Sequence, residues 1–299
     1  MPVLNIMVGL PGSGKSTYAY EYKINDDIVL SSDELRQEMF HDVNDQSHNQ
    51  EVFCELHRRV RKELNKGTTV WFDATNINMK SRRKVINLVP KGTIINAIVL
   101  APLIEECVAR DKARTRTVGE KVIEKFVNRF EMPIFEEGFN QIDIISNGFM
   151  TYKDYDYWLY HAAAGFEQTS KYHQETLDGH LQMVAEQVME SYPISSPEVI
   201  GAYLHDVGKL WTRTQDENGD YHFYNHGNVG AYDFLSVVKC HSTKEEIQRR
   251  YQIAKIINYH DCSFMGWDYC NKRFSKEFVD FLKFFRECDE NGSIKKKDS

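Results

Sequence analysis

The sequence has little that would place it among secreted, disulfide-bonded or membrane proteins. Its six cysteines include no CxxC pair, which argues against a zinc ribbon or a thioredoxin-like motif. The apolar run at residues 3–8 has the length of a strand, not of a membrane span, and no basic segment leads into it. We therefore expect reduced thiols, no membrane partner and a cytoplasmic location.

An excess of positive charge is also missing. The chain has 37 Lys and Arg against 44 Asp and Glu, a net charge of −7, so a protein that coats nucleic acid through bulk charge is disfavoured. Residues 1–150 hold 20 basic and 21 acidic residues, whereas residues 151–299 hold 17 and 23. Eight of the eleven histidines also lie in the second half. Because His and Asp are common ligands of transition metals, we expect any metal site in that half.

What is present is the composition of a folded protein. Hydrophobic residues make up 41% of the 299 residues and charged residues 27%, and this length favours two domains or one large one. In the first half, short β-branched runs alternate with longer segments of helical spacing, which predicts a parallel sheet with helices on both faces. The expected strands are 3–8, 28–30, 68–72 and 93–100.

The second half has no comparable strand runs. Its periodic segments are separated by Gly, Pro and Asn clusters and predict helices. The expected helices are 177–190, 197–204, 245–259 and 276–287. We therefore predict an α/β domain over residues 1–150, followed by an all-α domain over residues 151–299.

Residues 9–17, GLPGSGKST, match the phosphate-binding loop G-x-x-x-x-G-K-[ST] between an expected strand and an expected helix. In such a loop, backbone N–H groups surround the nucleotide phosphates, the lysine contacts the β and γ phosphates, and the last hydroxyl binds Mg²⁺. The motif predicts ATP with Mg²⁺ as cofactor, Lys15 as a catalytic residue and Ser16 as a metal ligand. The expected nucleotide-binding residues are Gly12, Ser13, Gly14, Lys15, Ser16 and Thr17.

Polar side chains follow the second and third expected strands, at the ends that face the ligand crevice of a parallel sheet. Asp33 is suited to accept the proton of an attacking hydroxyl, and Arg36, one helical turn later, to hold a phosphate of the acceptor. The alternative is a helix N-cap aspartate followed by a surface arginine. Asp73 and Asn76, after the third strand, are candidate acceptor-binding residues.

Further basic residues follow the third and fourth strands. Arg110 and Arg114 are four residues apart, so both can point from one helix face toward a transferring phosphoryl group. A solvated helix face is the alternative for this run, as it is for the triplet at residues 82–84. We expect basic residues 36, 82, 83, 110 and 114 to form a local positive patch that the net charge of the whole chain conceals.

Together these motifs resemble those of a known kinase family. The phosphate-binding loop, S-x-D-x-x-R at residues 31–36, D-x-T-N at residues 73–76 and R-x-x-x-R at residues 110–114 resemble the 5′-kinase domain of bacteriophage-type polynucleotide kinase-phosphatases, over about residues 1–145. The resemblance implies that Asp33 is the general base and that Arg36 holds a phosphate of the acceptor. It also implies that Arg110 and Arg114 clamp the donor phosphates. Small-metabolite kinases share similar spacings.

The D-x-D-G-T motif of the phosphatase that follows such kinases is absent, and the second half carries an adjacent His205-Asp206 pair instead. Nitrogen and carboxylate ligands together suit Mn²⁺, Fe²⁺, Co²⁺, Ni²⁺ or Zn²⁺. The order H…HD…H…H…D resembles the HD-domain metal-dependent phosphohydrolases, over roughly residues 165–292. The resemblance implies one or two divalent metals. The implied ligands are His180, His205, Asp206 and Asp289, with His226 and His260 at positions that hold a second metal or the substrate phosphate in some members.

Three more residues near these positions are candidates for supporting roles. His173 is a further histidine of the series, and Asp261 is placed to orient His260 as a second-shell partner. Lys209 lies one helical turn after His205, so it would meet either a substrate phosphate, as a catalytic residue, or solvent.

The two halves together predict a bifunctional nucleic-acid end-healing enzyme. It would phosphorylate 5′-OH ends of RNA or DNA with ATP, and it would remove a terminal 2′ or 3′ phosphate or open a 2′,3′-cyclic phosphate, leaving ends that a ligase can join. One alternative is a nucleoside or small-metabolite kinase fused to an HD nucleotidase. The other is a kinase gated by a nucleotide-sensing HD module.

Overall fold

The computed structural model describes the chain except for residues 115, 169–173, 240–242 and 294–299. It divides into two compact units, Met1–Ser146 and Asn147–Ser299. None of the described helices combines the length and the apolar character that a membrane crossing requires.

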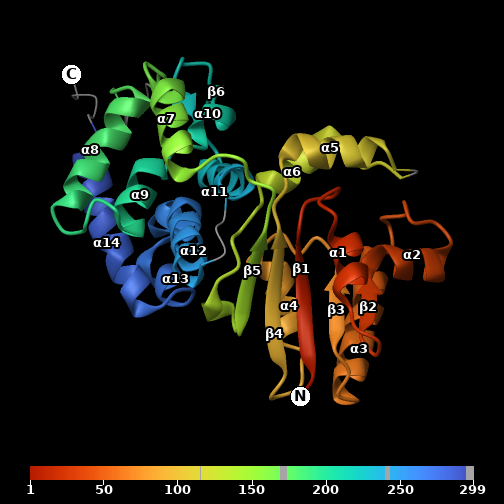
Figure 1. Ribbon diagram of the computed structural model, residues 1–299. Coiled ribbons are helices and arrows are strands. Elements are labelled where there is room, and N and C mark those ends of the chain that lie inside the picture. The colour runs from red at the N-terminus through yellow and green to blue at the C-terminus, as the bar shows by residue number, and fades with distance from the viewer. Residues whose placement is uncertain (115, 169–173, 240–242, 294–299) are drawn as a thin grey trace. The chain divides into compact units, whose positions relative to one another are not determined.

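The first unit is built on a five-stranded parallel sheet in the order β2-β3-β1-β4-β5 (Figure 1). The strands are β1 (Val3–Gly9), β2 (Ile28–Ser31), β3 (Val70–Asp73), β4 (Ile94–Leu100) and β5 (Gln141–Ile145). The predicted parallel sheet and its first four strands are confirmed, and β5 is an addition. Because β1 lies between β3 and β4, the order of the strands reverses at β1, and the carboxyl ends of these strands border the ligand crevice.

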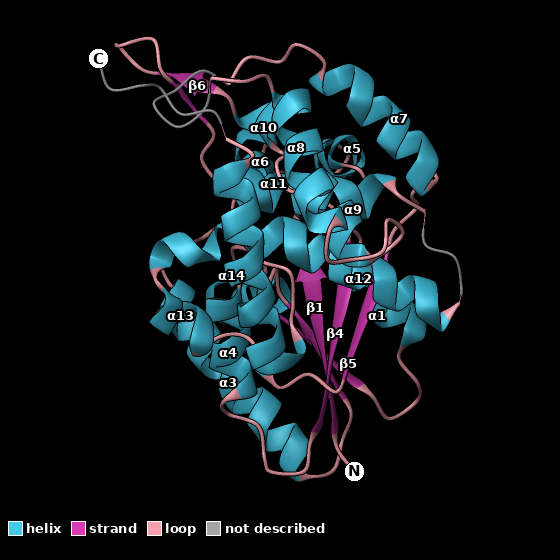
Figure 2. Ribbon diagram, turned by 90° about the vertical axis from the view of Figure 1, so that its left-hand side faces the viewer, coloured by secondary structure: helices cyan, strands magenta, loops and turns pink. Residues whose placement is uncertain are grey.

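Helices cover both faces of this sheet. They are α1 (Lys15–Tyr22), α2 (Ser32–Phe40), α3 (Asn49–Asn65), α4 (Met79–Ile86), α5 (Ile104–Lys112) and α6 (Glu120–Val127), with a 3-10 turn η1 (Phe135–Glu137). Ala19 of α1 packs with Met7 and Trp71 on one face. His57 of α3 lies against the ring of Phe72, which points to the other face because neighbouring strand residues alternate. Figure 2 shows α1 and α3 on opposite sides of the strands.

Arg82 does not belong to a basic surface. Its guanidinium is fully buried and donates to both carboxylate oxygens of Glu137, at 2.9 and 2.7 Å, and to the carbonyls of Asn76 and Glu131 at 3.1 and 2.9 Å. Met79 and Val85 are buried on the same face of α4. The expectation that Arg82 contributes to the basic patch is therefore wrong: it joins α4 to η1.

We expect Arg82→Met to destabilise the first unit by about 3–5 kcal/mol, because the Glu137 carboxylate would stay buried without its partner. Urea unfolding of the first unit measures this. The control is Arg58→Met, which breaks an exposed pair with Glu55 at 2.6 Å and should change the free energy of unfolding by less than about 1 kcal/mol. Equal effects of the two substitutions would contradict a structural role for the buried pair.

The second unit is helical, as predicted, apart from two antiparallel two-residue strands, β6 (Thr214–Gln215) and β7 (Tyr221–His222). The first of its helices are α7 (Tyr152–Ala163), α8 (Leu177–Met189), α9 (Pro197–Leu204) and α10 (Lys209–Thr212). They are followed by α11 (His226–Val237), α12 (Lys244–Tyr259), η2 (His260–Met265), α13 (Trp267–Asn271) and α14 (Lys276–Asn291).

Close packing brings the chemically important ends of these helices together. Val184 of α8, Ala202 of α9, Ile256 of α12 and Phe285 of α14 share one core cluster. Gly208 follows α9 so closely against α11 that a Cβ there would lie 2.0 Å from the carbonyl oxygen of His226. Only glycine fits at this contact, so the end of α9 and the start of α11 meet.

Candidate active site and candidate metal centre

The phosphate-binding loop joins β1 to α1 and depends on two glycines in the left-handed region. Gly12 has a φ of 82°, and a Cβ there would lie 2.3 Å from the carbonyl oxygen of Cys107 in α5. Gly14, with a φ of 93°, precedes α1 directly. Ser16 and Thr17 follow in the first turn, where backbone N–H groups at a helix N-terminus favour a phosphate.

Lys15 lies folded against this loop. Its Nζ donates to the carbonyls of Gly9 at 3.0 Å and Leu10 at 2.8 Å, and lies 3.5 Å from the Ser13 hydroxyl. Burial lowers the pKa of Lys15, although the nearby Asp73 carboxylate acts in the opposite direction. A nucleotide phosphate would be a stronger partner for this ammonium than the two carbonyls, because a charge-assisted bond replaces neutral ones.

Asp73 contacts the start of the helix that follows the phosphate-binding loop. It is the last residue of β3, and its Oδ2 accepts a 2.6 Å hydrogen bond from the hydroxyl of Ser16. A hydroxyl and a carboxylate at the carboxyl ends of adjacent strands are the oxygen pair that holds Mg²⁺ in phosphate-loop enzymes. Asp73 thus contacts the predicted Mg²⁺ ligand Ser16 and also borders the cavity, and its role in binding the acceptor stays a prediction.

Asp33 lies at the N-terminus of α2 but does not cap it. The cap is Ser31, whose Oγ accepts from the backbone N–H of Asp33 at 3.3 Å and of Glu34 at 3.5 Å. The Asp33 carboxylate instead receives Arg36 Nη1 at 2.9 Å and Arg116 Nη1 at 2.7 Å, both at Oδ1. The N-cap interpretation of Asp33 is therefore wrong.

Arg36 is not a surface arginine either, because it is only 3% exposed. Its Nη2 donates to Asn49 Oδ1 at 2.6 Å, while its Nε–H has no partner among the residues described. Arg116 was missed as a site residue, although it lies in the basic run that supplied Arg110 and Arg114.

A cavity of about 950 Å³ brings six of the predicted kinase residues together, with Arg116 beside them. Its lining includes Lys15, Ser16, Asp33, Arg36, Asp73, Arg114 and Arg116. The predicted residues that do not line it are Gly12, Ser13, Gly14, Thr17, Arg110 and Asn76. Arg110 is half exposed and pairs with Glu106 on its own helix at 2.7 Å. Asn76 is buried with a φ of 45°, and its amide donates to the carbonyl of Met7 at 2.8 Å, which fixes the loop after β3 to β1.

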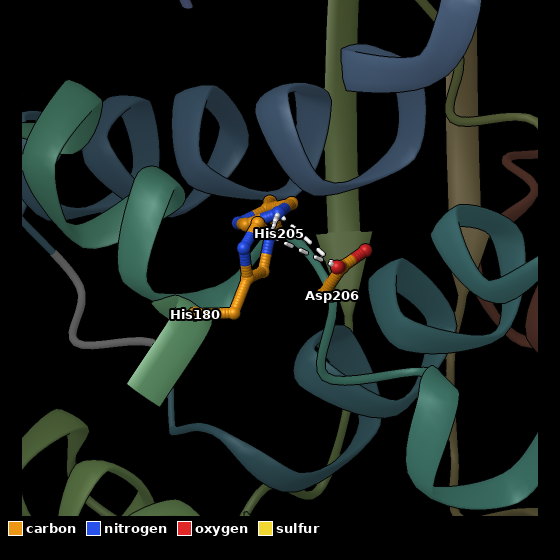
Figure 3. Close-up of side chains that lie close together, drawn as sticks. All are labelled: His180, His205 and Asp206. Carbon is orange, nitrogen blue, oxygen red and sulfur yellow. Dashed lines mark hydrogen bonds and ion pairs between the residues drawn. The ribbon is translucent and has the colours of Figure 1, made fainter. Parts of the chain in front are cut away.

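In the second unit, the predicted ligands converge from five elements around Asp206. Figure 3 shows His180 of α8 beside His205 and Asp206 at the end of α9. Asp206 Oδ2 lies 3.5 Å from His180 Nε2 and 3.3 Å from His205 Nε2, and Asp289 Oδ1 of α14 lies 3.1 and 3.5 Å from the same two nitrogens. These four residues form one possible ion site.

The other oxygen of Asp206 faces a second group. Oδ1 lies 2.8 Å from His226 Nε2 and 3.5 Å from His260 Nε2. The two oxygens of Asp261 lie 3.0 and 3.3 Å from these nitrogens. The Asp261 carboxylate therefore faces the Nε2 atoms inside the cluster, where it could itself bind an ion. The expectation that it acts as a second-shell partner that orients His260 is wrong. Asp206 is common to both groups.

The imidazoles are oriented as metal ligands are. The Nδ1 atoms of His180, His205, His226 and His260 lie 3.2, 2.6, 2.8 and 2.9 Å from backbone carbonyl oxygens. Because a carbonyl only accepts, each Nδ1 carries a proton, and Nε2 is the nitrogen that each ring directs at the cluster. The Nε2 atoms of His180 and His205 are 3.2 Å apart, and those of His226 and His260 are 3.0 Å apart.

The cluster favours bound positive charge. Burial alone would lower the pKa of His205, but the carboxylates of Asp206 and Asp289 raise it to about 10. Burial likewise opposes the charge of Asp206, but His205, Lys209 and His226 hold its pKa well below the ordinary value. Converging Nε2 atoms around the buried carboxylate of Asp206, with the partly exposed carboxylates of Asp289 and Asp261 beside them, are a donor set that fits divalent transition metals.

Lys209 faces the cluster and not solvent. It is 4% exposed, and its Nζ lies 2.5 Å from Asp206 Oδ2 and 2.9 Å from Gln168 Oε1. His173 lies outside the residues that the structure describes, so its placement stays a prediction.

Several known proteins are similar to part of this chain. A curated relative, transcription factor bHLH140 of Arabidopsis thaliana, is 26% identical over 148 residues, which is 47% of this chain and 15% of the relative. The chain thus spans only a small part of that relative. Among solved structures, a chain of the Pnkp1/Rnl/Hen1 RNA repair complex is 27% identical, with 43% of each chain covered and a TM-score of 0.39.

Two further solved structures are similar. One is a second structure of the Pnkp1/Rnl/Hen1 complex, 28% identical, covering 36% of this chain and 38% of that one with a TM-score of 0.34. The other is a gluconokinase from Sinorhizobium meliloti 1021, 14% identical, covering 48% and 82% with a TM-score of 0.32. These scores are too low to support a structural argument. Residues 4–133 match a family model described as an AAA domain, and with the loop and sheet described above the first unit has a P-loop kinase fold.

Proposed function

We propose that this protein heals nucleic-acid ends. Its first unit would transfer the γ-phosphoryl group of ATP to a 5′-OH end, and its second unit would remove a terminal 2′ or 3′ phosphate or open a 2′,3′-cyclic phosphate. The observation that carries the proposal is the presence on one chain of two sites suited to phosphate chemistry. They are the P-loop cavity that contains Asp33 and Arg36, and the His and Asp cluster around Asp206.

In the first unit, the cavity supports in-line transfer. The Asp33 side chain is 54% exposed and lies in the same cavity as Lys15 and Ser16. As the 5′ oxygen bonds to the γ-phosphorus, Asp33 takes its proton, and the bond from that phosphorus to the departing ADP oxygen breaks. Arg36 retains an unpaired N–H for a phosphate of the acceptor, and Arg114 borders the cavity as a further cation.

In the second unit, the two ligand groups around Asp206 would hold one or two divalent transition metals. Bound there, such ions would lower the pKa of water and offset the charge of the phosphate. One ion would be held by His180, His205 and Asp289, and the other by His226, His260 and Asp261. Asp206 would contribute to both sites. Lys209 would place its ammonium beside the substrate phosphate. The water oxygen bonds to phosphorus, the ester bond to the sugar oxygen breaks, and that oxygen gains a proton.

An oligonucleotide with a 5′-OH and a 3′ phosphate tests both halves at once. The protein is incubated with it, ATP and Mg²⁺ or Mn²⁺, and mass spectrometry reads both ends. A gained 5′ phosphate and a lost 3′ phosphate are expected. If neither end changes while free nucleosides or nucleotides react, a metabolite kinase fused to a nucleotidase replaces the proposal. Ligand binding to the second unit that changes kinase activity, without hydrolysis, would indicate a sensing module.

The metal assignment predicts a graded loss of bound metal. His226→Ala is expected to remove the ion of one group and to leave the His180 group loaded, because the two groups share only Asp206. Elemental analysis of the purified protein measures the metal-to-protein ratio. The control is His222→Ala, which removes an exposed histidine that pairs with Asp216 at 3.0 Å. If both variants keep the wild-type metal-to-protein ratio, the metal assignment is contradicted.

A further inference from the structure

A second cation follows Lys209 at the edge of the candidate metal centre. Arg213 comes directly after α10 and four residues after Lys209, so the two side chains leave the same face of this short helix, about 5–6 Å apart at their Cβ atoms. Lys209 is buried against Asp206, whereas Arg213 is exposed. The pair therefore offers one cation inside the site and one at its rim.

Aromatic rings hold the guanidinium of Arg213 in place. Its Cζ lies 4.5 Å from the ring centre of Phe166 and 5.0 Å from that of Tyr221, and its Nη1 donates to the carbonyl of Glu167 at 3.5 Å. Among the residues that the structure describes, no carboxylate contacts the Arg213 guanidinium. A guanidinium stacked on aromatic faces loses little freedom on binding and keeps N–H groups for a planar, charged partner such as phosphate.

The same aromatic residues connect Arg213 to the ligand cluster. The Phe166 ring lies 6.2 Å from the Phe223 ring, and Lys209 Nζ lies 5.3 Å from the centre of the Phe223 ring. The carbonyl of Phe223 accepts the Nδ1–H of the ligand His226 at 2.8 Å. The rings of Phe166 and Phe223 thus form a series of contacts that leads from Arg213 to the residues around Asp206.

We propose that Arg213 binds the second phosphate of a strand, the phosphodiester next to the terminal phosphate that is removed. This inference rests on the proposed function of the second unit and narrows its substrate to an oligonucleotide or polynucleotide end. When the terminal phosphate is bound at the cluster, the Arg213 guanidinium at the rim can still bind another phosphate. A mononucleotide with a single phosphate has nothing to place there, whereas a strand carries its next phosphate one nucleotide away.

The experiment compares two substrates: a nucleoside 3′-monophosphate, and an oligonucleotide with a 3′ phosphate whose 5′ end is already phosphorylated, so that it is no kinase acceptor. Arg213→Met should raise KM for the oligonucleotide about tenfold with little change in kcat, because a charge-assisted contact made equally in ground and transition states is lost. The mononucleotide kinetics should not change. Arg213→Lys should restore part of the loss, since it keeps the charge but not the planar fork.

Two further measurements make the result decisive. Removal of one phosphate contact should reduce the slope of log Kd against log salt for the oligonucleotide by roughly 0.7. The control is Arg273→Met, which removes an arginine stacked 4.4 Å from the ring of Tyr269, and this variant should behave as wild type. Equal losses on both substrates, or an unchanged salt slope, overturn the role of Arg213. Failure of the wild type to hydrolyse either substrate overturns the proposed function instead, and the salt slope still decides the role of Arg213.

Discussion

The Asp33→Asn variant is expected to lose 5′ phosphorylation by about 10²–10⁴-fold and to keep its affinity for ATP. Asparagine preserves the shape of the side chain but cannot take the proton of the attacking hydroxyl. ATP should bind as before, because the predicted nucleotide contacts come from the loop at Gly12 to Thr17 and not from α2. The rate of transfer from labelled ATP to a 5′-OH oligonucleotide, together with an ATP titration, measures both quantities.

The matched control is Glu34→Gln, one residue along the same helix. Its carboxylate accepts the hydroxyl of Tyr20 at 2.6 Å and does not line the cavity, so transfer should continue at nearly the wild-type rate. Hydrolysis of the 3′ phosphate should be unchanged in both variants. Asp33→Asn with full kinase activity would remove Asp33 from the mechanism, and a concomitant loss of ATP binding would show that it acts through the structure of the cavity.

The Asp206→Asn variant is expected to lose hydrolysis of the terminal phosphate by about 10³-fold or more. Its carboxylate is the one group shared by both ligand sets, so its neutralisation weakens both. Metal activation supplies several kcal/mol of transition-state stabilisation, and each 1.36 kcal/mol changes the rate tenfold. The substitution also leaves the Lys209 ammonium beside an uncharged amide. Release of phosphate and the metal-to-protein ratio should therefore fall together.

The control here is Asp233→Asn in α11. This carboxylate pairs with the hydroxyl of Tyr155 at 2.7 Å, away from the ligand cluster, and the variant should keep its metal and its hydrolysis. The 5′ phosphorylation of the same oligonucleotide serves as an internal check on Asp206→Asn, since the first unit should be unaffected. Full retention of metal and hydrolysis by Asp206→Asn would contradict the proposed centre.

Local pattern predicted most of the elements, and its failures have physical reasons. The strands β1, β3 and β4 are largely buried apolar runs and β2 is a short, partly buried one, whereas β5 reads QIDII, with an exposed residue at each end, and carries too weak a pattern to be noticed. Both interpretations of Arg82, as part of a basic patch and as part of a solvated helix face, place it at the surface. Its partner Glu137 is 55 residues away, so no local pattern shows that this charge is buried.

Short motifs predicted candidate site residues but not which of them contact one another. The loop, Asp33, Arg36 and the His and Asp ligands are given by short motifs whose chemistry is restrictive. That Asp73 meets Ser16 depends on the pairing of β3 with β1, and that Asp206 faces two groups depends on how α9 meets α11. Arg116 and Arg213 belong to no motif, and their positions become informative only when Asp33 and the Phe166 ring are seen beside them.

The backbone contacts of the histidines have a consequence for how such a centre can change. In His205, His226 and His260, the ring nitrogen donates to the carbonyl three residues earlier, at Ala202, Phe223 and Ile257. The orientation of each of these rings is therefore encoded within a four-residue segment. Loss of one of these side chains would leave the others directed at the cluster, so the proposed centre could be altered one residue at a time, and substitutions could adjust its metal number or preference without a new fold.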